Sequence, residues 1–287
     1  MKGRFLPAFF SDIWAKKKMP IGVFDSGLGG LTVWAALAAR LPGQGFVYLG
    51  DNAHAPYGPR DPDEIYDLTC AGVDTLFQRG CKLVVLACNT ASAVALRRMQ
   101  EQWVPADRRV LGVFVPMIEV LAKRNWADKS RPRHVGIERV ALFATKATVD
   151  SGAFARELAF RAKGVEVFSQ ACVGLVDAIE DGDMVSAELM VRDYVIEMAK
   201  KCPDPQVAVL GCTHYPLVQD VFERALPPGT LVLSQPAIVA ESLADYLLRH
   251  PEFARVGATE FLTTGDAVQV SQQAHRFLGM ELGFQGV

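Results

Sequence analysis

The chain alternates between short apolar runs and longer amphipathic stretches, and this alternation predicts a parallel α/β fold. Short apolar runs bounded by turn residues are typical of strands buried on both faces of a sheet, whereas the amphipathic stretches are typical of covering helices. We predict strands over residues 20–24, 46–49, 83–87, 110–113, 140–144, 165–168, 207–210, 230–233 and 261–264. We predict helices over residues 61–79, 90–102, 153–162, 184–201, 237–248 and 266–278, and another at Pro116.

The order of these elements bears on the number of sheets. Strands alternate with helices along the whole chain, which favours mainly parallel sheets covered by helices on both faces. Two segments far apart in the sequence, LVVLACNTASA (residues 83–93) and QVAVLGCTHYPL (residues 206–217), share one build. Each is an apolar run that stops at a cysteine and then turns polar. Their similarity predicts two sheets of related build.

The two cysteines therefore lie where a strand gives way to a helix, which is the usual ligand-binding edge of an open α/β sheet. Asn89 and Thr90 follow Cys88, and Thr213 and His214 follow Cys212. Residues of these types can cap a helix, bind an anion or tune a thiol. The duplication predicts two half-sites that face one substrate.

A third strand end carries Asp25, in the glycine-rich segment DSGLGGLTV. The segment lacks the G-x-G-x-x-G order of dinucleotide-binding loops, so it favours a general base or a helix cap over a phosphate site. Together with His214, Asp25 could give each cysteine its own proton-transfer partner, and two facing thiols could then invert a stereocentre. Spacing leaves other interpretations open, because it does not fix facing geometry. They are a redox pair, two structural thiols, a cysteine hydrolase or transferase using Cys212 and His214, and an anion-binding module.

Composition narrows the class of protein. Of the 287 residues half are apolar and 22% are charged, and the net charge is −2, so neither a broad nucleic-acid surface nor a membrane span is expected. The six cysteines include no C-x-x-C pair, which argues against a disulfide framework or a zinc site and favours reduced thiols in the cytoplasm. Residues 1–18 lack the features of a signal peptide.

Four motifs in order carry a family resemblance: VFDSGLGG, DNAHAPYG, ACNTASA and GCTHYPL, with weaker matches in TKATVDS and FLTTGD. From about Pro20 to about Gly279 the chain resembles glutamate racemases, which are cofactor-independent amino-acid racemases of the aspartate/glutamate racemase family. The resemblance implies two pseudo-symmetric α/β domains with the active site in the cleft between them. It implies an extension over residues 1–19, a first domain of residues 20–113 plus 234–287, and a second domain of residues 114–233.

The resemblance also implies residue roles. Cys88 would act on D-glutamate with help from Asp25, and Cys212 on L-glutamate with help from His214. Glu180 matches an acid near the second cysteine, in a motif that is loose here because a proline common after Cys172 is missing. The residues implied to bind substrate are Asp25, Ser26, Pro56, Tyr57, Gly58, Asn89, Thr90, Thr148, Thr213 and His214.

The implied function is racemisation of glutamate without a cofactor, which supplies D-glutamate for peptidoglycan in the cytoplasm. A homodimer and regulation by a cell-wall precursor, in which residues 1–18 could take part, are further expectations. A racemase of aspartate or a related acid is the nearest alternative. The chain departs from many relatives at Asn52 and His54, where threonine and arginine are common.

Overall fold

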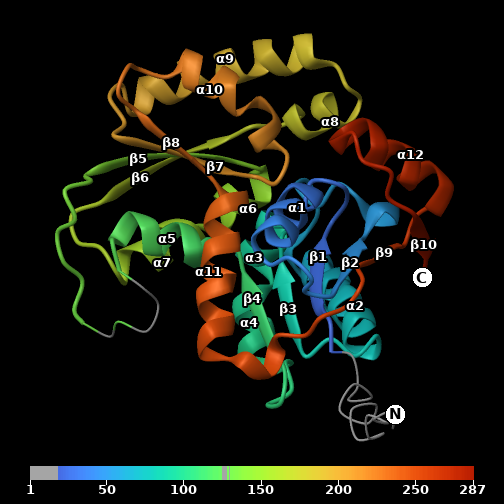
Figure 1. Ribbon diagram of the computed structural model, residues 1–287. Coiled ribbons are helices and arrows are strands. Elements are labelled where there is room, and N and C mark those ends of the chain that lie inside the picture. The colour runs from blue at the N-terminus through green and yellow to red at the C-terminus, as the bar shows by residue number, and fades with distance from the viewer. Residues whose placement is uncertain (1–18, 125–127, 129) are drawn as a thin grey trace, which may run out of the picture.

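The protein is described by a computed structural model over residues 19–124, 128 and 130–287. The expected N-terminal extension, apart from Met19, and part of the predicted linker at 125–138 lie outside the described residues. Two sheets organise the rest (Figure 1). Every strand pair in both sheets is parallel, and helices flank the sheets, which confirms the predicted fold class.

The larger sheet has six strands and the smaller has four. The six-stranded sheet has the order β10 (Phe284–Gly286), β9 (Glu260–Thr263), β2 (Phe46–Gly50), β1 (Ile21–Asp25), β3 (Leu83–Leu86) and β4 (Arg109–Gly112). The four-stranded sheet has the order β6 (Glu166–Ala171), β5 (Arg139–Ala144), β7 (Val207–Gly211) and β8 (Leu231–Ser234). The strands that lead to Asp25, Cys88 and Cys212 are interior strands, so their ends are held on both sides.

Helices cover both faces of each sheet. One apolar core joins the facing sides of the two sheets with α1 (Leu31–Arg40), α5 (Phe114–Ala122), α7 (Ala153–Ala159) and α11 (Gln235–Arg249). The outer side of the six-stranded sheet packs on α2 (Pro62–Gln78), α3 (Asn89–Val94) and α4 (Leu96–Gln102). The outer side of the four-stranded sheet packs on α8 (Leu175–Glu180), α9 (Met184–Lys201) and α10 (Gln219–Ala225). The remaining helices are α6 (Lys146–Ser151), α12 (Ala267–Leu278), and the short 3-10 helices η2 (Asn52–His54), η3 (Tyr215–Val218) and η4 (Pro251–Phe253).

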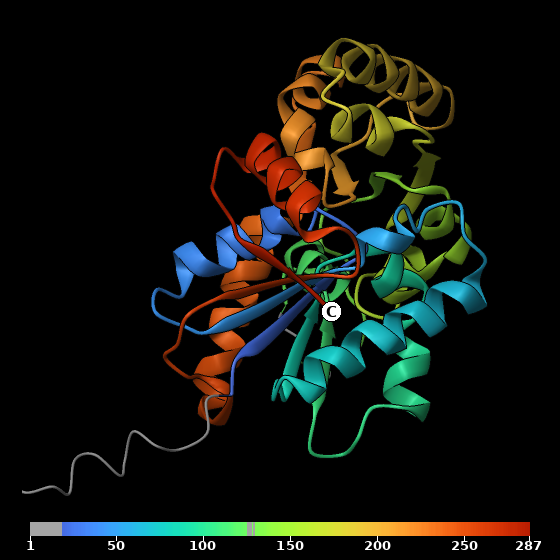
Figure 2. The ribbon, with the colours of Figure 1, turned by 90° about the vertical axis from the view of Figure 1, so that its right-hand side faces the viewer.

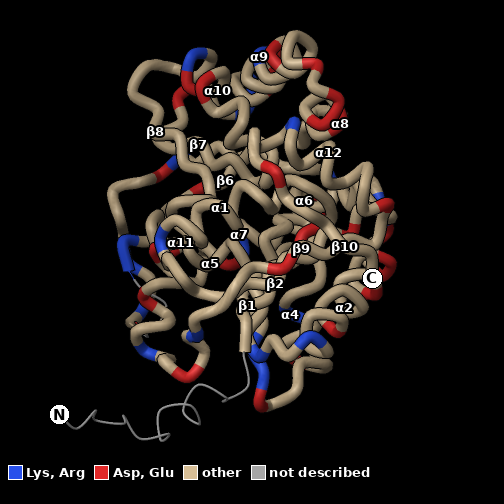
Figure 3. Tube along the Cα trace, turned by 45° about the vertical axis from the view of Figure 1, so that its right-hand side comes forward, with Lys and Arg blue, Asp and Glu red and all other residues tan. Residues whose placement is uncertain are grey.

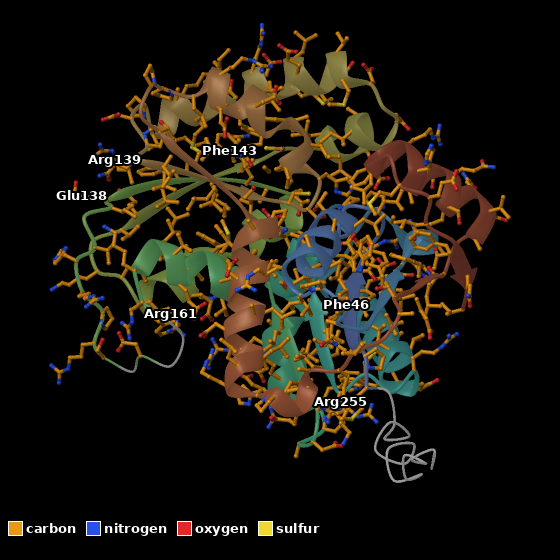
Figure 4. The ribbon with its side chains drawn as sticks, viewed as in Figure 1. Phe46, Glu138, Arg139, Phe143, Arg161 and Arg255 are labelled. Carbon is orange, nitrogen blue, oxygen red and sulfur yellow. The ribbon has the colours of Figure 1, made fainter. Side chains whose placement is uncertain are left out.

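Side-chain alternation along the strands builds these layers. In β5, Val140 and Leu142 face the shared core, whereas Ala141 and Phe143 face the outer helices. Phe46 and Phe143 are fully buried in the two halves of the molecule, and Arg139 and Arg255 lie at its periphery (Figure 4). Burial on both sides explains why the interior strands β1, β2, β3 and β7 read as continuous apolar runs.

The chain passes between the sheets twice, from β4 through α5 to β5 and from β8 through α11 to β9 (Figure 2). Charged residues of both signs are dispersed around the trace, as expected from the small net charge (Figure 3). Among the described residues, no helix is long and apolar enough to cross a membrane.

Several element boundaries differ from the sequence prediction. The helix predicted over 90–102 is two helices that meet at Ala95, and α6, α8 and β10 were not predicted. Helix α11 begins at Gln235, two residues earlier than predicted, because Pro236 occupies its first turn, where a missing N–H is tolerated. Helices α2 and α9 agree with the prediction, and each has an aspartate as N-cap.

Candidate active site

The first half of the candidate site lies at the carboxyl end of β1 and β3. These strands are neighbours, with Phe24 opposite Leu86, and the Cys88 N–H donates to the Phe24 carbonyl at 3.4 Å. Asp25, the last residue of β1, and Cys88, the N-cap of α3, therefore leave the same edge of one sheet. The parallel pairing gives this closeness to two residues that are far apart in the sequence.

The thiol of Cys88 is 4% exposed and has two hydrogen-bond partners. Its Sγ accepts from the Ala91 N–H at 3.4 Å, and its S–H donates to the Ser26 Oγ at 3.4 Å. Burial, followed by the negative charge of Asp25, raises the pKa of Cys88 to about 12. Cys88 consequently holds its proton at neutral pH.

Asp25 lies between the two half-sites. The side chain is fully buried, and its Oδ2 accepts from the Gly27 N–H at 3.0 Å. Burial raises the pKa of Asp25 to about 6, while the positive charge of His214 opposes that rise. Its charge therefore acts on Cys88 in one half-site and on His214 in the other.

The second half of the site follows β7. The Sγ of Cys212 lies 3.7 Å from the Nδ1 of His214, and the Nε2 of the same ring lies 2.8 Å from the Oε1 of Glu180 at the end of α8. Burial disfavours the charged ring, but the hydrogen bonds to Cys212 and Glu180 outweigh it and raise the pKa of His214 to about 10. His214 is thus an imidazolium at neutral pH, placed between a sulfur and a carboxylate.

The loops after β1 and β7 pack directly on each other, which brings the two half-sites together. A Cβ at Gly29 would lie 2.3 Å from the Thr213 Oγ1 and 2.5 Å from the His214 ring, so only glycine allows this approach. The Thr32 hydroxyl also donates to the Thr213 carbonyl at 2.9 Å. A Cβ at Gly27 would lie 3.6 Å from the Glu180 Oε1. The β1 loop of one sheet is therefore part of the surroundings of Cys212 on the other.

Hydroxyl groups make a second bridge between the sheets. The Thr90 Oγ1 in α3 lies 2.9 Å from the Thr145 Oγ1, which caps α6 and lies 3.0 Å from the Thr148 Oγ1. Thr90, Thr148 and Thr213 are all buried. These hydroxyls can hydrogen-bond the carboxylates of a small acid without an arginine.

The loop that contains Pro56, Tyr57 and Gly58 is anchored by a buried carboxylate. Tyr57 is 1% exposed and its hydroxyl donates to the Asp51 Oδ2 at 2.6 Å, so this group anchors the loop. Pro56 is exposed and follows a cis peptide bond, and the Gly58 carbonyl accepts from the Ala147 N–H at 3.2 Å. The loop thus makes its contact with the second half of the molecule through its backbone.

The two departures from the family motif take part in this anchor. The His54 Nδ1 lies 2.8 Å from the Asp51 Oδ1, which also accepts from the Thr264 hydroxyl at 2.6 Å. The Asn52 Oδ1 accepts from the Thr263 hydroxyl at 2.9 Å. Asn52 therefore ties the loop to the end of β9, and His54 shares the Asp51 carboxylate with Thr264.

Sequence reasoning missed Asp51 and Gln235. Asp51 follows β2 at the same sheet edge as Asp25, and its N–H donates to the Asp25 carbonyl at 2.9 Å. Gln235 follows β8 and its Nε2 donates to the Asn89 Oδ1 at 2.6 Å. The available signal was a polar residue within two positions of the end of a predicted strand, a place that also singled out Asp25. In the described part of the chain, no cluster of three or more His, Cys, Asp or Glu side chains could hold a metal ion.

Comparisons with known proteins agree with this geometry. Residues 31–243 match the family model described as Asp/Glu/Hydantoin racemase. The chain is 61% identical to a glutamate racemase of Roseobacter denitrificans over 266 residues, which are 93% of this chain and 99% of that protein.

Solved structures give the same result for the fold. The glutamate racemase isoform RacE1 from Bacillus anthracis superposes with a TM-score of 0.83 at 29% identity, covering 95% of this chain and 98% of that one. A glutamate racemase from Francisella tularensis in complex with D-glutamate has a TM-score of 0.81 at 26% identity, covering 94% and 97%. An Escherichia coli glutamate racemase in complex with L-glutamate and the activator UDP-MurNAc-Ala has a TM-score of 0.69 at 27% identity, covering 93% and 97%.

Proposed function

Because the chain belongs to the Asp/Glu/hydantoin racemase family, we propose that it interconverts L-glutamate and D-glutamate by proton transfer between two cysteines. The observation that carries this proposal is that two buried thiols follow strands of two different sheets. Each thiol has its own ionisable neighbours. Asp25, whose charge acts on both half-sites, supports their working on one substrate.

In the L-to-D direction, the Cys212 thiolate removes the α-proton of L-glutamate, so the C–H bond breaks and an S–H bond forms. The electron pair stays on the α-carbon, which becomes planar. The Cys88 thiol then donates its proton to the opposite face, which gives D-glutamate and a Cys88 thiolate. The D-to-L direction is the reverse, and solvent protons restore the starting state after a net conversion.

The charges around the two thiols support this assignment. Cys88 is protonated beside the anionic Asp25, which suits the proton donor for the D face. The imidazolium of His214 lies beside Cys212 and can hydrogen-bond a negative sulfur there. Conversion of D-glutamate requires the opposite distribution of protons, with Cys88 as the thiolate and Cys212 as the thiol.

The α-proton is very weakly acidic, so the carbanion needs fixed hydrogen-bond donors. The residues that we assign to holding the carboxylates and the amine are Asp25, Ser26, Pro56, Tyr57, Gly58, Asn89, Thr90, Thr148, Thr213 and His214. Glu180 holds His214 in place. The burial of Asn89 and of the three threonines supports this set.

The wider setting belongs to the same proposal. It includes a supply of D-glutamate for peptidoglycan in the cytoplasm, a homodimer, and two domains of residues 20–113 plus 234–287 and 114–233. Regulation by a cell-wall precursor is supported by the activator bound to the Escherichia coli relative.

The test is α-hydrogen exchange by the purified protein in deuterated water without added cofactor. Either enantiomer of glutamate should become a racemic mixture with deuterium at the α-carbon, as followed by NMR and chiral chromatography. A Cys88→Ala, Cys212→Ala double variant serves as the blank. Absence of deuterium with both enantiomers would overturn the proposal, and faster exchange into aspartate would replace glutamate as the substrate.

A further inference from the structure

One side-chain hydrogen bond joins the two half-sites through residues that are not acids, bases or thiols. The Gln235 Nε2 donates to the Asn89 Oδ1 at 2.6 Å. Asn89 directly follows Cys88, and Gln235 directly follows β8. Strand β8 pairs with β7, the strand before Cys212, and Ser234 lies opposite Leu210 in that pair. The pair thus connects the Cys88 edge of one sheet with the edge of the other sheet from which Cys212 departs.

Both side chains are buried, but only one of the two polar atoms of each side chain has a hydrogen-bond partner. Asn89 is 2% exposed and Gln235 is 1% exposed. The Asn89 Nδ2 and the Gln235 Oε1 have no partner among the described residues. Buried amide groups in proteins nearly always have a hydrogen-bond partner, so this buried donor, on the residue after Cys88, is available to a ligand.

The hydrogen bond also determines which atom of Asn89 is free. A carboxamide can turn over and exchange its oxygen and nitrogen, and the two arrangements have almost the same shape. With the Gln235 Nε2 as the donor, the Oδ1 of Asn89 faces Gln235, and the Nδ2 is directed away from it as a free donor. A donor is the group that a carboxylate requires.

We propose that Gln235 is a positioning residue, which holds the Asn89 carboxamide in the orientation that donates to a carboxylate of the amino-acid substrate. This inference rests on the proposed function, since it concerns the substrate of the same site. A pair with a merely structural role would gain nothing from leaving one buried donor and one buried acceptor unused. An apolar pair would fill the same space without unsatisfied groups.

The first test is Gln235→Met, which keeps the length of the side chain and removes its donor. We expect the KM for both enantiomers of glutamate to rise about tenfold, with kcat changed less than about threefold, because the Asn89 amide can then turn freely. Gln219→Met is the matched control. The Gln219 Oε1 accepts from the hydroxyl of Ser234, the residue before Gln235, at 2.7 Å. Gln219→Met should leave KM within about twofold of the wild-type value.

The second test is Gln235→Glu, which separates orientation from packing. A carboxylate at this position only accepts, so the Asn89 amide turns over and presents its oxygen to the substrate carboxylate. At lower pH the protonated carboxyl donates to the Oδ1 and restores the native arrangement. The ratio of the variant's KM to that of the wild type should therefore rise as pH rises from about 6 to about 9. In an Asn89→Ala background the ratio should become independent of pH, because no amide is left to turn over; a pH dependence that persists there would show that the charge of the glutamate acts by itself.

A double-variant cycle completes the test. In an Asn89→Ala background, Gln235→Met should raise KM less than about twofold further, because the group that it positions is gone. Thermal unfolding of each variant reports folding. If the wild type racemises glutamate but the two substitutions add independently, or Gln235→Met leaves KM unchanged, this inference is wrong and the proposed function stands. A wild type that exchanges no α-proton would instead overturn the proposed function.

Discussion

The two half-sites have the same place in the fold but opposite electrostatic surroundings. Cys88 and Cys212 both follow an interior strand of a parallel sheet, and both are nearly buried. The neighbour that acts on Cys88 is the carboxyl group of Asp25, whereas the neighbour of Cys212 is the imidazolium of His214, held by Glu180. A repeated fold therefore supplies two similar positions, and the side chains around them give one thiol a carboxyl neighbour and the other an imidazolium neighbour.

This difference bears on the protonation of Cys88 in the free protein. A symmetric pair of thiols would hold a proton on either side with equal ease. Here burial and Asp25 raise the pKa of Cys88 to about 12, so the proton resides there. The charge of Asp25 also interacts with the charge of His214, so the two half-sites are electrostatically coupled.

Replacing either cysteine tests whether both half-sites are required for racemisation. We expect these substitutions to have the largest effect. Cys88→Ser and Cys212→Ser should each lower kcat for racemisation in both directions by about 10³-fold or more, because a hydroxyl is a much weaker acid and base at neutral pH. Chiral chromatography measures the conversion. Cys70→Ser, at a half-buried thiol in α2, is the control and should retain activity. Full activity of either Cys88→Ser or Cys212→Ser with either enantiomer would exclude the two-base mechanism.

Removing the charge of Glu180 should weaken the Cys212 half selectively. Glu180→Gln keeps a hydrogen-bond partner for His214 but removes the anion that helps to raise the pKa of the ring to about 10. The pKa was raised by folding, so the imidazolium is present below this value and is lost as pH rises through it. In the variant that loss should occur at lower pH, and we expect kcat to fall about 10²-fold at neutral pH.

The measurement is the pH dependence of kcat/KM for L-glutamate. Its alkaline limb should move toward neutrality in Glu180→Gln and stay in place in Glu188→Gln, which changes a carboxylate on α9 paired with Arg192. An unchanged alkaline limb in Glu180→Gln would show that Glu180 does not affect the function of Cys212.

Asp25→Asn should reduce the electrostatic difference between the surroundings of Cys88 and Cys212, and it should stabilise the protein. The pKa of Asp25 rises from 3.8 to about 6 on folding, so the folded state binds the proton more tightly and the wild type loses stability as pH rises from about 4 to about 6. The asparagine variant lacks this loss and should gain about 2 kcal/mol in the free energy of unfolding at pH 7. Its kcat should fall about tenfold, because Cys88 loses its partner.

Denaturant unfolding at pH 4 and pH 7 checks the stability part of this prediction. The gain should be present at pH 7 and absent at pH 4. Asp245→Asn, at an exposed ion pair with Arg249 on α11, should show little change at either pH. An equal gain at both pH values would show that the buried charge is not its cause.

The smallest effect is expected from Tyr57→Phe, which tests how far the Cys88 half depends on its neighbouring loop. Loss of the hydroxyl leaves Asp51 with one fewer hydrogen bond, so the variant should lose about 1–2 kcal/mol of stability and its KM should rise about threefold. Thermal unfolding and steady-state kinetics measure both. Tyr66→Phe, at a half-buried tyrosine of α2 whose ring lies under the Arg98 guanidinium, is the control. A change in kcat without a change in stability or KM would show that the Tyr57 hydroxyl takes part in proton transfer rather than in anchoring the loop.

Much of the fold was readable from the sequence because the interior strands β1, β2, β3 and β7 are buried on both sides. The run before Cys88 predicted a strand within one residue of the observed bounds, and α9 agreed at both ends. Short elements without an apolar period, such as α6 and β10, were missed. Their position depends on packing against distant segments, for example on the pairing of β10 with β9.

The sequence by itself determined the chemistry that is available at the site. Strand periodicity placed Asp25, Cys88 and Cys212 at strand ends, since buried parallel strands have a recognisable composition. Only the tertiary structure decided which groups act on each other, because contacts between residues far apart in the chain depend on strand order and loop packing. It brought Glu180 to His214, set Gly29 against Thr213, and paired Gln235 with Asn89. The electrostatic difference between the two thiols comes from these long-range contacts, and no local pattern encodes it.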